Sequence, residues 1–326
     1  MLSRVIKKLK DLLRVPTLLW ELRRDFETFS AFTQKNLESS ARDSRHLLFL
    51  SALLLNEINR AKRDAILKDI KASEYRVFSQ WCDDGIIQFL VDFLEIEAKT
   101  FIEFGVESYV ECNTRFLLEN NNWRGLVIDG SEEYMARIKQ EDIYWKFDLT
   151  AVCAFVDKDN INRLIRENGM HGEIGLLHID IDGNDYHVWK AITVISPVIV
   201  IVEYNSVFGI ENAWTVPYDP KFQRTKRHHS NLYFGASLLS LCDLAKEKGY
   251  SFIGCNSAGN NAYFVRNDNL RHLCVKTPQE GYVCSAFRES RNAAGKFDYI
   301  SGDKRIGVLK GLEVLNTRTG KLEPIP

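Results

Sequence analysis

The sequence predicts an α/β fold built on a Rossmann-like sheet, in which parallel strands end in an antiparallel hairpin. From about Ser79 onward, continuous apolar runs alternate with amphipathic helical patterns, as expected where helices cover both faces of a parallel sheet. Acidic residues and glycines stand where several of these runs end. Only six residues, 256–261, separate the last two runs, which is too short for a helical crossover and predicts a hairpin.

Seven strands and five helices are expected in this region. The expected strands are residues 100–104, 125–128, 143–147, 174–179, 198–203, 250–255 and 262–266. The expected helices are residues 85–94, 114–121, 160–168, 186–192 and 236–248.

Three regions are expected along the chain: a helical region at residues 1–75, the sheet domain at 76–266, and an appendage at 267–326. Residues 1–15 have apolar positions three and four apart between basic ones. Such a helix can lie on an anionic membrane surface, or it can pack against its own domain or a partner subunit, a second copy of the chain included. The glycine-rich appendage suits either a lid or a structural wrap.

Composition and charge argue against several classes of function and site. The net charge of −1 over 326 residues gives no case for a nucleic-acid partner. Seven scattered cysteines without a CxxC pair indicate reduced thiols and argue against a disulfide framework or a zinc site. No apolar run reaches the roughly 18–20 residues that span a bilayer. We expect a cytoplasmic protein, peripheral at the inner membrane face if residues 1–15 bind lipid.

The first expected strand ends in Glu103 and Gly105. An acid, one spacer and a glycine at a strand end suit a cofactor with an amino-acid tail, because the glycine lets the backbone approach the ligand closely. Glu107 follows, and its negative charge is a poor neighbour for the pyrophosphate of NAD or FAD. A positively charged sulfonium tolerates it better.

The next two expected strands each lead into an acid. Asp129 stands 24 positions after Gly105, where a carboxylate can bond ribose hydroxyls, and Gly130 and Ser131 follow it. Capping the next helix is the alternative for Asp129 or Ser131. Asp148, after residues 143–147, is expected either to meet an adenine amino group or to cap a helix.

Carboxylates also follow the fourth and fifth strands. Asp180 and Asp182 come after one, and Glu203 and Asn205 after its neighbour, so these side chains are expected to converge. Oxygen ligands of this kind suit Mg²⁺ or Ca²⁺, which could acidify an acceptor hydroxyl. In the alternative interpretation, one carboxylate contacts the cofactor, one caps a helix, and Glu203 holds a loop.

We take Asp182, Glu203 and Asn205 as candidate metal ligands, Asp180 as a cofactor contact, and Asp182 or His229 as the catalytic base. The alternative for His229, one of two adjacent loop histidines, is an exposed or structural side chain.

The sequence resembles FkbM-type class I S-adenosylmethionine-dependent methyltransferases over about residues 76–266. The segments that carry the resemblance are SQWCDDGII (79–87), FIEFGVE (101–107), LVIDGS (126–131), LLHIDIDGNDYHVWKAI (176–192) and VIVIVEYN (198–205). The resemblance implies O-methylation, often of sugar hydroxyls. By the same resemblance, the residues expected to contact the cofactor are Glu103, Gly105, Asp129 and Asp180.

We therefore expect an O-methyltransferase that binds S-adenosylmethionine, with Mg²⁺ as a second cofactor, and methylates a hydroxyl of a sugar or glycan. The first alternative is a catalytically inactive protein of the same fold that serves as a scaffold in glycan assembly. The second is a nicotinamide-dependent oxidoreductase, which the expected antiparallel hairpin and Glu107 disfavour.

Overall fold

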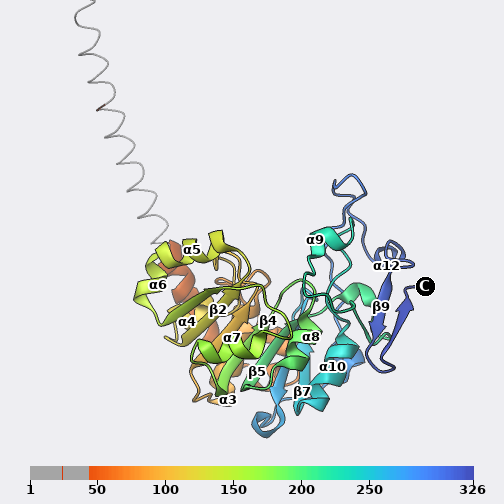
Figure 1. Ribbon diagram of the computed structural model, residues 1–326. Coiled ribbons are helices and arrows are strands. Elements are labelled where there is room, and N and C mark those ends of the chain that lie inside the picture. Colours follow the sequence, from red (N-terminus) through yellow and green to blue (C-terminus); the bar gives the residue numbers. More distant parts are fainter. Residues whose placement is uncertain (1–23, 25–43) are drawn as a thin grey trace, which may run out of the picture. The chain divides into compact units, whose positions relative to one another are not determined.

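The computed structural model describes residue 24 and residues 44–326 (Figure 1). The chain divides into two compact units at Leu53 and Leu54. In the first unit, residues 44–53 are helical. The amphipathic helix expected at residues 1–15 lies outside the described residues. Within the described part, no helix is long and apolar enough to cross a membrane.

A seven-stranded sheet forms the centre of the second unit, in the order β3-β2-β1-β4-β5-β8-β7. Its strands are β1 (Thr100–Phe104), β2 (Arg124–Asp129), β3 (Leu149–Cys153), β4 (Gly172–Ile179), β5 (Ile195–Glu203), β7 (Tyr250–Cys255) and β8 (Asn261–Arg266). Neighbours pair in parallel except β5 with β8 and β8 with β7, so β8 alone runs against the others. This order with a reversed β8 is the class I methyltransferase topology, and it confirms the predicted fold class.

Helices cover both faces of the sheet. One face packs against α3 (Asp83–Leu94), α4 (Arg115–Glu119) and α5 (Glu132–Gln140), and the other against α7 (Ile161–Glu167), α8 (Asp185–Ala191) and α10 (Leu238–Glu247). Side chains along β1 point alternately to the two faces of the sheet. Phe101 packs in the core on the α3 side, and Ile102 and Phe104 pack in the core on the α7 side. Burial on both faces explains why the central strands are continuous apolar runs.

The prediction of a strand at residues 143–147 is wrong. Residues 143–146 belong to α6 (Asp142–Lys146), Phe147 is its C-cap, and β3 begins only at Leu149. The aromatic residues there gave a strand-like pattern. Trp145 is nevertheless exposed, and Asp142 bonds Lys146 one helical turn later at 2.6 Å.

Residues 54–75 belong to the same compact unit as the sheet. Two short helical segments, α2 (Arg63–Ile66) and η1 (Ile70–Ser73), place Ile66 and Ile70 in the core on the α3 side. The boundary after residue 75, which the sequence predicts, stays a prediction.

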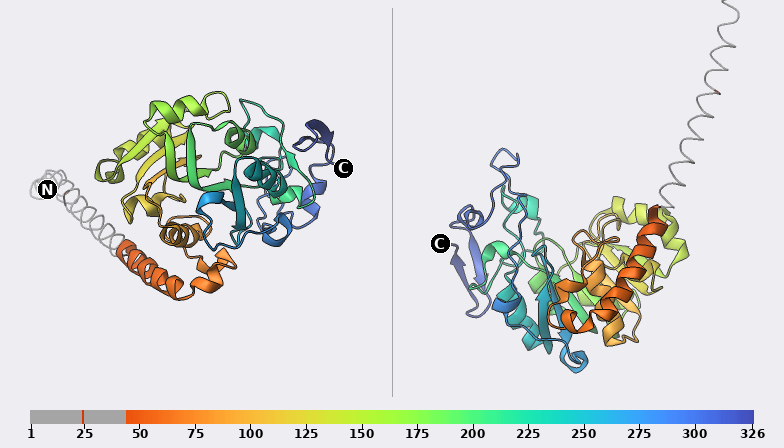
Figure 2. Two further views of the ribbon diagram at one scale, coloured as in Figure 1. Left: turned by 90° about the horizontal axis from the view of Figure 1, so that it is seen from below. Right: turned by 180° about the vertical axis from the view of Figure 1, so that it is seen from behind.

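The appendage at residues 267–326 builds a second, small sheet. Its β9 (Glu313–Asn316) pairs with β10 (Lys321–Pro324) and with β6 (Trp214–Thr215), all antiparallel. Figures 1 and 2 show β9 and β10 (blue) at the α10 side of this unit, away from α5 and α6. The other elements are η2 (Ser206–Phe208), α9 (Arg224–Arg227), η3 (Asn267–Asn269), α11 (Pro278–Gly281) and α12 (Lys304–Gly307).

Gly85 is required where α3 meets η1. A Cβ there would lie 2.1 Å from the Ser73 carbonyl oxygen and 2.4 Å from the Tyr75 nitrogen. We expect Gly85→Ala to lower the free energy of unfolding by about 1–3 kcal/mol through overpacking, measured by urea unfolding. Gly307→Ala is the matched control, because no atom lies within 4 Å of its added Cβ. Equal stability of the two variants would contradict this packing.

Candidate functional site

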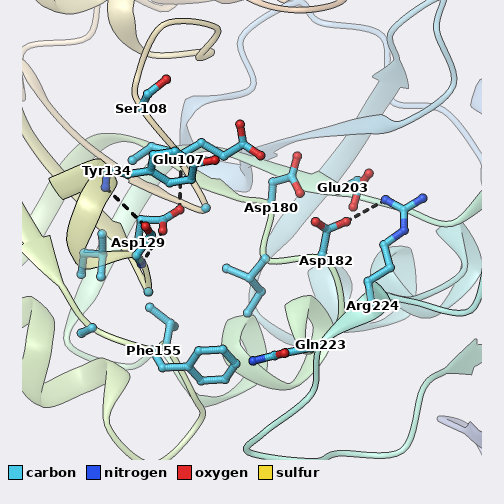
Figure 3. Close-up of a pocket in the computed structure, with 18 of the residues that line it drawn as sticks. Glu107, Ser108, Asp129, Tyr134, Phe155, Asp180, Asp182, Glu203, Gln223 and Arg224 are labelled. Carbon is cyan, nitrogen blue, oxygen red and sulfur yellow. Dashed lines mark hydrogen bonds and ion pairs between the residues drawn. The ribbon is translucent and has the colours of Figure 1, made fainter. Parts of the chain in front are cut away.

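A cavity of about 1060 Å³ opens at the carboxyl ends of β1, β2, β4 and β5 (Figure 3). This edge is where open α/β sheets bind ligands, since the loops diverge there. Figure 3 shows Asp129, Tyr134 and Phe155 on one side, and Asp180, Asp182, Glu203 and Arg224 on the other. The residues predicted from sequence that line it are Gly105, Asp129, Gly130, Ser131, Asp180, Asp182 and Glu203.

Gly105 brings the β1 loop against the end of β4. Its φ is +74°, and a Cβ there would lie 1.7 Å from the Asp180 carbonyl oxygen. Only glycine combines that backbone conformation with so close an approach. The backbone at Gly105 therefore forms a bare wall of the cavity.

Glu103 has a different role from the one predicted. Its buried carboxylate accepts bonds from the backbone nitrogens of Asn113 (3.0 Å) and Thr114 (3.1 Å), from the Thr114 hydroxyl, and from His178 Nδ1 at 2.8 Å. It does not line the cavity. Glu103 closes the loop that leads into α4 and does not extend into the cofactor space.

Glu103 and His178 shift each other's pKa toward the charged forms. Burial alone would raise the pKa of Glu103, but the hydrogen bond and charge of His178 outweigh it, so the pKa is lowered. For His178, burial lowers the pKa, and the bond and charge of Glu103 raise it further than burial lowers it. Asn113 Nδ2 lies 3.2 Å from His178 Nε2, so the imidazole ties β4 to the same loop.

Asp129 ends β2 and faces the cavity. One carboxylate oxygen accepts from Glu107 N at 2.9 Å and the other from Ser131 N at 2.8 Å. Each oxygen keeps a second lone pair for a ligand hydroxyl. Ser131 caps α5 by accepting from Tyr134 N at 3.3 Å. Ser131 thus takes the capping role that was the alternative for Asp129 or Ser131, and the Asp129 carboxylate lines the cavity.

The prediction for Asp148 requires correction. Because residues 143–146 form a helix, Asp148 precedes β3 and does not follow a strand. It lies at the opposite end of the sheet from the cavity, exposed, with its carboxylate 3.9 Å from Arg124 Nε. Ala154 and Phe155, which follow β3, line the cavity at that position.

Asp180, Asp182 and Glu203 converge, with ligand oxygens within 4.8 Å of one another. Burial and the charge of Asp182 raise the pKa of Asp180 to about 7. Burial and the charge of Asp180 raise the pKa of Glu203 well above its usual range. Within the described part of the chain, Glu203 Oε2 is buried without a hydrogen-bond partner. Three crowded carboxylates with an unsatisfied buried oxygen form a site suited to a cation.

Asn205 is not part of this cluster. Its amide nitrogen donates to the carbonyls of Leu232 (2.8 Å) and Phe234 (3.0 Å), and its oxygen accepts from Val207 N at 3.0 Å. The predicted metal ligand is therefore a structural residue that caps η2.

His229 is not brought to the cavity either. It is exposed, and its ring lies 4.2 Å from that of His228. Of the two candidate bases, only Asp182 lines the cavity.

Arg224 and Glu289 are site residues that the sequence analysis missed. Arg224 on α9 donates to Asp182 at 2.7 Å and to Glu289 at 2.5 Å, and its guanidinium lies 3.6 Å from the centre of the Phe234 ring. The RTKR run was a signal for a basic element, but its partner Glu289 comes from the appendage. Only the folded chain brings the two together.

The cavity is strongly acidic. Two arginines line it, Arg137 and Arg224. The lining carboxylates are Glu107, Glu111, Asp129, Asp180, Asp182, Glu203 and Glu289. This balance favours positively charged ligands and disfavours a bound pyrophosphate.

No protein-family model matches the sequence, and a search of curated protein sequences finds no match. Among solved structures, the N-terminal domain of EvdMO1 with SAH bound is similar, with a TM-score of 0.38 and 11% identity over 58% of this chain and 80% of that one. The Bacillus cereus O-methyltransferase in complex with SAH has a TM-score of 0.38 and 16% identity, over 65% and 90%. The methyltransferase domain of bacterial CtHen1 has a TM-score of 0.36 and 16% identity, over 56% and 98%. The fold assignment rests on the strand order of the sheet.

Glu103→Gln should open the loop into α4. The amide replaces an acceptor oxygen with a donor, which leaves buried donors unsatisfied and should lower the free energy of unfolding by about 2–4 kcal/mol. Hydrogen exchange at the Asn113 and Thr114 amides should quicken, whereas the exposed Glu97→Gln leaves both unchanged. A variant that loses S-adenosylhomocysteine affinity without losing stability or protection would instead make Glu103 a direct cofactor contact.

Proposed function

We propose that the protein is an S-adenosylmethionine-dependent O-methyltransferase that acts on a hydroxyl of a sugar or glycan, with a divalent cation in its acceptor site. The observation that carries the proposal is the acidic cavity at the carboxyl ends of β1, β2 and β4, with the bare backbone of Gly105 and the carboxylate of Asp129 in its wall. A sulfonium nucleoside fits this lining, whereas a dinucleotide would place its pyrophosphate beside Glu107.

The residues present fit the cofactor. Gly105 presents its backbone to the cavity, and the free lone pairs of Asp129 suit ribose hydroxyls. Phe155 and Tyr134 offer aromatic surface on the same side of the cavity (Figure 3). When bound, S-adenosylmethionine supplies a methyl group on a positively charged sulfur, which an oxygen nucleophile can displace directly.

The carboxylates fit a cation. Asp180, Asp182 and Glu203 offer hard oxygen ligands, and a cation would satisfy the orphaned Glu203 Oε2. A bound Mg²⁺ supplies Lewis acidity that orients an acceptor hydroxyl and lowers its pKa.

Asp182 is the proposed base. Asp182 lines the cavity, and Arg224 holds one of its oxygens at 2.7 Å, which leaves the other as the proposed acceptor of the hydroxyl proton. Asp182 lies in the left-handed region with a φ of +56°. The neighbouring turn is fixed because Asp185 accepts from Ile181 N (2.8 Å) and Gly183 N (2.9 Å).

The FkbM-type affiliation, a cytoplasmic location and a peripheral membrane contact through residues 1–15 belong to the same proposal. Their support is the motif pattern and the charge pattern of the sequence.

Calorimetric binding of S-adenosylmethionine and S-adenosylhomocysteine tests the cofactor, with NAD as the competing ligand. We expect micromolar binding to wild type, a loss of at least tenfold, about 1.4 kcal/mol, in Asp129→Ala, and no binding of NAD. Asp148→Ala is the matched control, since the same change is made at an acid that lies outside the cavity. Folded wild-type protein that binds neither sulfur ligand would refute the cofactor and favour the scaffold alternative.

Glu203→Gln separates cation binding from stability. Without added metal the variant should be at least as stable as wild type, because it removes a crowded buried carboxylate. Mg²⁺ or Mn²⁺ should raise the melting temperature of wild type and not of the variant, measured by thermal unfolding and calorimetry. Asp159→Asn, at an exposed acid outside the cluster, should respond like wild type. Equal metal stabilisation of all three proteins would argue against the site.

A further inference from the structure

Residues 287–299 of the appendage form an arm beside α9 (Figure 1), and Glu289 near its start lines the cavity. At its start, the ring of Phe287 stacks on Trp81 with 4.6 Å between ring centres, and Trp81 follows the cavity-lining Gln80. Two residues later, Glu289 lines the cavity and bonds Arg224. The arm is therefore attached to two different parts of the cavity wall.

The arm has a defined shape. Buried Ser290 accepts from Asp298 N at 3.0 Å and from Ile300 N at 2.7 Å, and its hydroxyl bonds the Asp298 carboxylate. Arg291 N donates to the carbonyl of Ser230 at 3.1 Å, which ties the arm to the loop after α9. Arg291 and Phe297 form an antiparallel bridge. These bonds hold the arm in a hairpin form.

Four exposed side chains on the arm form one stack. The rings of Phe297 and Tyr299 lie 5.7 Å apart at 14°, the Arg291 guanidinium is 4.6 Å from the Phe297 ring centre, and the Arg288 guanidinium is 5.8 Å from the Tyr299 ring centre. Phe297 is 51% exposed and Tyr299 59% exposed. Stacking on aromatic rings orders both guanidiniums before any ligand binds, so less side-chain entropy is lost on binding.

Among the residues that the structure describes, the positive charges of this stack have no acidic partner. Within residues 44–326, neither Arg288, Arg291 nor Lys296 forms an ion pair. The two acids of the arm are already engaged, Glu289 by Arg224 and Asp298 by Ser290. A basic arm thus stands beside a cavity whose interior is acidic.

We propose that this arm binds a carboxylate or phosphate of the acceptor while the hydroxyl to be methylated enters the cavity. The methylation step in this inference rests on the proposed function, whereas the binding of an anion by the arm does not. Planar guanidiniums bind both kinds of anion through paired hydrogen bonds. Arg288 and Arg291 are within two residues of the cavity-lining Glu289, about 7 Å of extended chain. The anion would therefore bind beside the cavity wall that Glu289 forms.

Binding of charged and neutral oligomers tests the arm. The probes are a hexamer of galacturonic acid, a glycerol-phosphate oligomer and maltohexaose, titrated calorimetrically at low and physiological salt into the full chain. We expect at least one anionic oligomer to bind tenfold or more tightly than maltohexaose. Arg288→Gln with Arg291→Gln should abolish that preference. The control variant, Lys310→Gln with Lys321→Gln, removes the same amount of positive charge from the small-sheet part of the appendage. This control should retain the preference for the anionic oligomer.

Two outcomes would overturn the proposal. One is equal affinity for charged and neutral oligomers, or a preference that the arginine variant keeps. The other is that the protein binds phosphatidylglycerol vesicles through both arginines but binds neither anionic oligomer. That result would make the arm a membrane contact. S-adenosylhomocysteine binding is measured in the same preparations. If that binding persists while the anion preference is absent, the arm proposal fails and the proposed function stands.

Discussion

The site depends on one buried carboxylate. Glu103 lies in the middle of the sheet edge. Its carboxylate accepts hydrogen bonds from the Asn113 and Thr114 amides, the Thr114 hydroxyl and the His178 imidazole. A buried charge is tolerated only when it is paired and fully bonded, so this arrangement has little freedom. It fixes the loop after β1 relative to β4. Gly105 and Asp180 then meet at the wall of the cavity.

The sequence allowed the fold to be predicted wherever burial controlled the pattern. The central strands are apolar because helices cover both faces, and the short connection at residues 256–261 excluded a crossover and revealed the reversed strand. The failure at residues 143–147 has the opposite cause. Aromatic residues in a short amphipathic segment have high strand propensity, yet α6 lies on the surface with Trp145 in solvent.

The candidate site was predicted in part, and its errors share a cause. A strand-end position indicates which edge of the sheet a residue occupies, and this placed Asp129, Asp180, Asp182 and Glu203 correctly at the cavity. It does not indicate where the polar atoms point. Asn205 turns its amide to nearby carbonyls. Arg224 and Glu289 meet across 65 positions of sequence, a contact that no local pattern encodes.

The two faces of the cavity differ in charge because they come from different parts of the chain. The interior consists of strand ends, where acids bond backbone amides and crowd one another. The appendage adds Glu289 to the cavity wall, and its arm carries guanidiniums ordered by aromatic rings. Arg224 joins them, since it contacts Asp182 on one side and Glu289 on the other. The acidic lining of the cavity and the basic arm are thus linked through one arginine.

The small sheet also constrains the order of folding during synthesis. Trp214 in β6 pairs with Asn316 in β9, which the ribosome adds 102 residues later. The core around Trp214 is completed by Leu309, Val314 and Ile325. The large sheet has all its strands once β8 is made, whereas this core stays open until the last of these residues emerges. At common elongation rates of about 5–20 residues per second, the interval lasts roughly 5–20 s, and apolar side chains around β6 are exposed to chaperones throughout it.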